Sequence, residues 1–210
     1  GVSVAAGMVD MMSGRYSIVT APGPGSPAVV KVFRLWLMKP FGPAAGQPAM
    51  HGAQDVDAPV TTASFAPFGT RYRGGLSLAV GWLAGSLGGA QSIVVGQRAG
   101  GTVKVYSSGS ALDGAPMVYL KNPEDHDYGV GFSATATFDP FGGTSVSVGT
   151  TATTSGADLL VGGTTADGRP VRVTKYAMVR ATATARTLRA LPLGRLASMP
   201  GTQAPSIGGN

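Results

Sequence analysis

The chain has 210 residues, a formal net charge of +6 and no cysteine. The lack of cysteine excludes disulfides, thiolate catalysis and cysteine-ligated metals. Only 12% of the residues are charged and Glu124 is the single glutamate, which argues against a fold made mainly of exposed helices. The 33 glycines and 15 prolines, placed between apolar runs, favour a turn-rich all-β protein.

The charge pattern also limits the partners. The 16 Lys and Arg residues are scattered along the chain, whereas a nucleic-acid surface needs them clustered on one face. We therefore expect no nucleic-acid partner. No stretch approaches ~18 consecutive apolar residues, so we expect no membrane-spanning helix.

A short phrase occurs three times, at residues 1–7, 75–81 and 143–149, and reads GVSVAAG, GLSLAVG and GTSVSVG. Glycine opens and closes each copy and serine holds the third place. Self-similarity at such a long period indicates a repeat architecture. We expect Gly1, Gly75 and Gly143 to occupy equivalent positions.

Alternation of apolar and polar residues predicts the strands. In chain order they span residues 1–7, 17–20, 28–33, 60–65, 75–81, 92–96, 102–106, 132–138, 143–149, 158–162, 171–176 and a last one between 179 and 191. Two repeats close on FAPFG at 65–69 and FDPFG at 138–142, with a weak echo, LPLG, at 191–194. We expect this aromatic phrase to pack between neighbouring repeats. Four short strands per repeat are typical of a propeller blade.

The order of these motifs resembles that of FG-GAP repeats, the blades of integrin-α-like β-propellers. The resemblance covers residues 1–193 and implies an all-β, propeller-like array of three four-stranded blades. The blades would span 1–69, with an insertion at 34–59, then 70–142 and 143–193, followed by an extended tail at 194–210. Propellers close with about four to eight blades, so further blades or partner chains should complete the ring. Because Gly1 already lies inside a repeat, we expect a processed or partial product.

The resemblance also points to the loop after the first strand of each repeat, where FG-GAP blades often bind calcium. Such a site needs several oxygen ligands with net negative charge. The matching segments are 8–14, 82–88 and 150–156, and Asp10 is the one carboxylate among them. We therefore expect no calcium, with loops closed by hydroxyl and backbone hydrogen bonds. Asp10 remains the only weak metal candidate.

Other candidate sites have competing interpretations. Residues 123–128 form a dense acidic cluster with His126, which fits either a solvated loop or a metal site completed by distant residues. Nucleophilic catalysis has no support, because the Gly-x-Ser phrases lack the Gly-x-Ser-x-Gly elbow. His51 lies in the irregular insertion, so a Ser-His-Asp set would be coincidental.

The insertion opens with RLWLMKPF at 34–41. It either extends the preceding strand and packs on its own blade, or forms a docking surface, since Trp, Met and Phe are favoured at interface cores. In the second case Trp36, Met38 and Phe41 would contact a partner.

These features predict a non-enzymatic recognition or scaffold module, with a role such as cell adhesion, that binds protein or glycan partners. We expect it to be extracellular, at the cell surface or periplasmic, and to need no cofactor. Two alternatives remain open. One is an accessory propeller domain of a secreted polysaccharide-acting enzyme, and the other is a structural subunit of a multiprotein complex.

Overall fold

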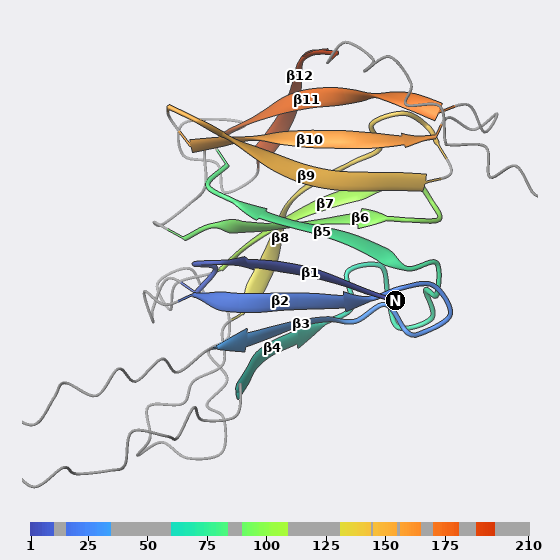
Figure 1. Ribbon diagram of the computed structural model, residues 1–210, viewed down its shortest axis with the longest axis vertical. Coiled ribbons are helices and arrows are strands. Elements are labelled where there is room, and N and C mark those ends of the chain that lie inside the picture. Colours follow the sequence, from blue (N-terminus) through green and yellow to red (C-terminus); the bar gives the residue numbers. More distant parts are fainter. Residues whose placement is uncertain are drawn as a thin grey trace, which may run out of the picture.

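The computed structural model of the protein describes residues 1–10, 16–34, 60–83, 90–108, 131–143, 145–154, 156–164, 170–180 and 188–195. Within these ranges every regular element is a β-strand, which confirms the all-β prediction. The strands form three four-stranded antiparallel sheets, each built from four consecutive strands and stacked in chain order (Figure 1). No helix in this part of the chain is long and apolar enough to cross a membrane.

Each sheet keeps its strands in sequence order. Sheet 1 contains β1 (Val2–Gly7), β2 (Ser17–Pro22), β3 (Val30–Arg34) and β4 (Val60–Phe65). Sheet 2 contains β5 (Leu76–Gly81), β6 (Ser92–Gln97), β7 (Val103–Ser108) and β8 (Phe132–Phe138). Sheet 3 contains β9 (Ser145–Thr153), β10 (Gly156–Thr164), β11 (Pro170–Arg180) and β12 (Leu188–Arg195).

The hydrophobic core lies between the sheets in two clusters, one at the interface of sheets 1 and 2 (junction 1) and one at the interface of sheets 2 and 3 (junction 2). Sheet 2 is therefore covered on both faces, and its central strand β6 reads as a continuous apolar run. Ile93 and Val95 are fully buried in junction 1, whereas Val94 is fully buried in junction 2. Each such side chain stabilises the stack by roughly 1.5–3 kcal/mol.

The serine of the repeated phrase links one sheet to the next. The Ser3 hydroxyl donates to the carbonyl oxygen of Leu76 at 2.7 Å, and the Ser77 hydroxyl donates to that of Val146 at 3.1 Å. A short side chain is needed there because the first strands of neighbouring sheets approach closely. The same pairing makes Val146 the counterpart of Leu76.

The position of Val146 opposite Ser77 shows that the predicted alignment of the third repeat is wrong. If Gly143 matched Gly75, Thr144 would match Leu76, but Val146 takes that place, two residues later. Gly1 and Gly75 are equivalent as predicted, because their carbonyl oxygens accept from the backbone N–H groups of Gly23 and Arg98, each the first residue after the second strand of its sheet.

Two further predictions for the third repeat are wrong. The segment predicted as a loop at 150–156 is largely strand, because β9 continues to Thr153, which pairs with Gly156 at the start of β10. The last strand was predicted between 179 and 191, but β11 extends through Arg180 and β12 spans Leu188–Arg195. The LPLG echo therefore lies inside a strand rather than after one, with Pro192 opposite Tyr176.

One turn glycine shows why the chain uses this residue where sheets meet. Gly101, just before β7, has a φ of 77°, a conformation that L side chains rarely adopt. A Cβ at this position would also collide with the carbonyl oxygen of Gly143, which leads into sheet 3. Glycine is required at this position both by backbone conformation and by close packing.

Candidate binding pocket between sheets 2 and 3

The aromatic phrase at the end of the fourth strand packs against the next sheet, as predicted. Phe65 of β4 contacts Tyr106 of β7, with ring centroids 4.7 Å apart and a 45° angle between the rings. Phe138 of β8 contacts Tyr176 of β11 in the same way, at 5.4 Å and 51°. Such tilted pairs contribute about 0.5–1.5 kcal/mol beyond their buried area. Each phrase therefore joins its own sheet to the following one.

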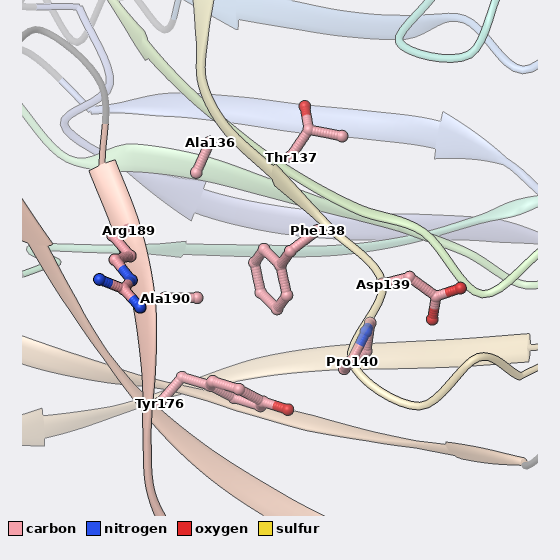
Figure 2. Close-up of a pocket in the computed structure, with 8 residues that line it drawn as sticks. All are labelled: Ala136, Thr137, Phe138, Asp139, Pro140, Tyr176, Arg189 and Ala190. Carbon is pink, nitrogen blue, oxygen red and sulfur yellow. The ribbon is translucent and has the colours of Figure 1, made fainter. Parts of the chain in front are cut away.

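A pocket of about 440 Å³ opens beside the Phe138–Tyr176 pair. It lies between sheets 2 and 3 and is bounded by β8 and its following turn, by β11 and by β12. Figure 2 shows its lining residues: Ala136, Thr137, Phe138, Asp139, Pro140, Tyr176, Arg189 and Ala190. Its volume falls within the range of small-ligand sites, about 300–1,000 Å³.

The pocket combines apolar walls with a polar rim. Phe138, Tyr176 and Ala190 belong to the junction 2 cluster or pack against it. Asp139 and Arg189 are exposed and carry opposite charges. Aromatic walls with a few polar groups at the mouth can hold a ring and orient its substituents.

The turn after β8 fixes one wall of the pocket. The Asp139 Oδ1 atom accepts hydrogen bonds from the backbone N–H groups of Phe141, at 3.2 Å, and Gly142, at 2.8 Å. This local side-chain-to-backbone arrangement closes the turn and holds Pro140 against the opening. The wall is thus set by the FDPFG phrase itself.

Burial raises the pKa of Tyr176 above its ordinary value. A tyrosine is already neutral at physiological pH, and burial extends the neutral form of the Tyr176 phenol to higher pH. In junction 1, burial raises the pKa of the equivalent Tyr106 to about 12. The buried tyrosine of each junction, Tyr106 or Tyr176, is therefore an uncharged aromatic residue.

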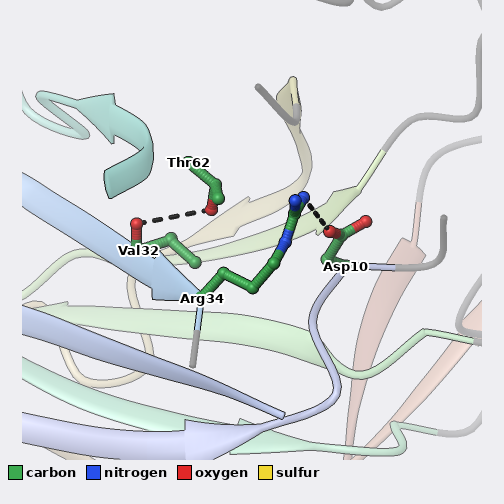
Figure 3. A network of polar contacts seen from close by, with 4 residues as sticks. All are labelled: Asp10, Val32, Arg34 and Thr62. Atoms are coloured by element: carbon green, nitrogen blue, oxygen red, sulfur yellow. Dashed lines mark hydrogen bonds and ion pairs between the residues drawn. The ribbon is translucent and has the colours of Figure 1, made fainter. Parts of the chain in front are cut away.

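Asp10, the weak metal candidate, lies in a different place and has a protein partner. Its Oδ2 atom is 2.8 Å from Nη2 of Arg34, and the two side chains are 1% and 3% exposed (Figure 3). Ionised groups in such a charge-assisted bond hold each other strongly. A divalent cation at Asp10 would have to displace this guanidinium, so the contact gives the aspartate a structural role.

Several predicted site residues lie outside the described ranges, namely Trp36, Met38 and Phe41 of the insertion, the acidic cluster at 123–128, and His51. Among the residues that the structure does describe, no group of three or more His, Asp or Glu side chains could hold a metal ion.

Sequence reasoning missed the pocket residues Tyr176, Arg189 and Ala190. The Phe-x-Pro-Phe phrase correctly indicated an aromatic contact between repeats. A tyrosine near the end of the third strand could have indicated its partner. No sequence signal marks the alanine.

No protein-family model, curated protein sequence or solved structure matches the chain.

Proposed function

We propose that the chain is a non-enzymatic recognition or scaffold module of FG-GAP β-propeller type. Each sheet would be one blade, further blades or partner chains would complete the array, and the module would bind protein or glycan partners outside the cell, at its surface or in the periplasm. One observation carries this proposal: both end faces of the stack expose apolar side chains, and those of sheet 1 occupy places whose counterparts in sheet 2 are covered by a neighbouring sheet.

The exposed face of sheet 1 is the first of these surfaces. Val2 and Val4 of β1 are 67% and 62% exposed. Leu76 occupies the place of Val2 in sheet 2 and is fully buried in junction 1, and Leu78, in the place of Val4, packs against the same cluster. The face of sheet 1 thus has the composition of a surface that another sheet covers.

The far face of sheet 3 is the second surface. Val173 of β11 and Leu191 of β12 are 39% and 37% exposed. Leu191 lies opposite Ala177 and on the other side of the strand from Ala190, which faces sheet 2. A stack that ends in apolar faces at both sides favours association with further sheets through the same kind of junction.

Analytical ultracentrifugation of the 210-residue chain tests this proposal. Because the end faces differ, copies would associate head to tail. We expect the wild type to sediment above the mass of one chain at about 100 μM, and Val4→Lys or Leu191→Lys to reduce this mass. The control is Ser26→Lys, a charge added at an exposed turn. A wild type that stays a single chain would refute the proposal that these faces are interfaces.

The two alternatives make different predictions for the parent polypeptide. An accessory domain of a polysaccharide-acting enzyme would be joined to a catalytic domain, whereas a structural subunit would reach its ring size only with partner chains. The intact mass of the parent polypeptide, compared with the mass of the native particle, separates them.

A further inference from the structure

The two sheet junctions share an aromatic pair but differ in the rings that surround it. In junction 1, Phe65 contacts not only Tyr106 but also Phe132 of β8, whose ring is stacked at 5.7 Å with an angle of 27°. Phe132 lies opposite Ser108, two residues after Tyr106 along β7. Phe65 is therefore the centre of a group of three rings in this junction.

Among the residues that the structure describes, junction 2 has no ring at the place of Phe132. Phe138 and Tyr176 repeat the first pair. The residue two positions after Tyr176 along β11 is Met178, and Ala190 of β12 lies opposite it. Ala190 thus occupies the register position that Phe132 holds in junction 1, and like Phe132 it packs against the core between its sheet and the preceding one.

The missing ring coincides with the pocket. Ala190 is one of the residues that line the opening of about 440 Å³, and Figure 2 shows its methyl group directed toward the ring of Phe138. Because protein interiors are normally close-packed, an open space where the sister junction holds a phenyl ring is a site of matching shape.

We propose that this pocket receives the aromatic side chain of a partner polypeptide. The incoming ring would stack on Phe138 beside Tyr176, as Phe132 stacks on Phe65 beside Tyr106. This inference rests on the proposed function, since it specifies how a recognition module would hold a protein partner.

The surroundings of the pocket favour a polypeptide that carries negative charge. β8 and β12 are the last strands of their sheets, so a chain segment can pass along the opening between them. Arg189 lies at the rim, and the whole chain has a formal charge of +6. Asp139 is held in its own turn through Oδ1, and within the described part of the chain no ion pair joins it to Arg189, so the guanidinium can pair with a partner's carboxylate.

The test uses the full chain and the peptide Ac-Asp-Phe-Asp-NH₂, with Ac-Asp-Ala-Asp-NH₂ as the matched control peptide. Binding is followed by NMR titration, with intermolecular NOEs locating the ring. We expect NOEs from the peptide ring to Phe138 and Tyr176, and at least tenfold weaker binding of the alanine peptide. Arg189→Gln should weaken binding of the phenylalanine peptide several-fold.

The decisive variant is Ala190→Phe, which should place the chain's own ring in the pocket as in junction 1. We expect it to fold and to lose peptide binding at least tenfold. Undiminished binding by this variant, or no binding by the wild type up to about 10 mM, would overturn the proposal. If the variant does not fold, the wild-type NOEs decide, since a ring located elsewhere also refutes the site.

A third probe separates this proposal from the broader one. If the neutral sugar maltotetraose shifted the pocket resonances and the peptide did not, the aromatic side-chain assignment would fail while a recognition role survived. Head-to-tail association through Val4 and Leu191 is measured independently of the pocket. Failure of the peptide test and failure of the proposed function are therefore distinguishable.

Discussion

The buried ion pair between Asp10 and Arg34 should be a main support of sheet 1. The two side chains are almost completely excluded from water and their charged atoms are 2.8 Å apart. Replacing Asp10 by asparagine keeps the shape but leaves the guanidinium buried without this counter-charge. Breaking a buried pair from one side costs about 3–5 kcal/mol. For a domain whose total stability is about 5–15 kcal/mol, this is a large fraction.

The measurement is thermal unfolding followed by circular dichroism, for wild type and Asp10→Asn. At about 2–4 °C per kcal/mol for a chain of this size, the melting temperature should fall by roughly 10 °C. Asp158→Asn is the matched control: its partner Lys175, 2.7 Å away, is 34% exposed, so the loss should be about 1 kcal/mol or less. Equal losses in the two variants would refute the reasoning from burial.

Four further outcomes are expected. Burial raises the pKa of Tyr106 from 10.0 to about 12, so its contribution to stability is complete below pH 10 and is lost as pH rises to about 12. Denaturation curves across this range should show the unfolding free energy falling with pH, and the fall per pH unit should be smaller in Tyr106→Phe. Ser77→Ala should lower the unfolding free energy by about 1 kcal/mol in urea titration, because its hydroxyl bonds to sheet 3. Gly101→Ala should lower the melting temperature more than Gly142→Ala, whose added Cβ meets no atom within 4 Å; equal shifts would count against the close packing. Millimolar calcium or EDTA should leave the melting temperature unchanged, because Asp10 is paired with Arg34. A rise in melting temperature with calcium would show that the ion displaces the Arg34 guanidinium from Asp10.

The strands of the first two repeats could be predicted because their pattern and position follow from local chemistry. In β3, the alternation of buried Val30 and Val32 with exposed Lys31 is legible in the sequence. The contact of Phe138 with sheet 3 was predictable too, because an aromatic cluster next to proline ends a strand and needs a neighbour to cover it.

The alignment of the third repeat could not be predicted, for a physical reason. Strand side chains alternate with a period of two, so a slip of one residue exchanges the faces but a slip of two preserves them. Matching Thr144 or Val146 to Leu76 therefore gives nearly the same alternation. Contacts between sheets distinguish the two, such as the hydrogen bonds that Ser77 donates to Val146 and Thr150 donates to Val80.

The two most informative sites depend on residues that lie far apart in the sequence. Asp10 follows β1, whereas Arg34 ends β3, and nothing in their local sequence signals the ion pair. The pocket depends on Ala190 lying opposite Met178, a relation set by the bulged pairing of β11 with β12. A single alanine carries no pattern, so its meaning emerges only by comparison with Phe132 in the sister junction.

The repeated construction of the two junctions can be measured most directly by NOESY on the isotopically labelled chain. We expect cross-peaks from Ser77 to Val146 and between the rings of Phe65 and Phe132, whereas on the side of β12 the ring of Phe138 should meet the methyl group of Ala190 and no further ring. Cross-peaks from Ser77 to Thr144 instead, or an aromatic ring beside Phe138 on the β12 side, would contradict this expectation.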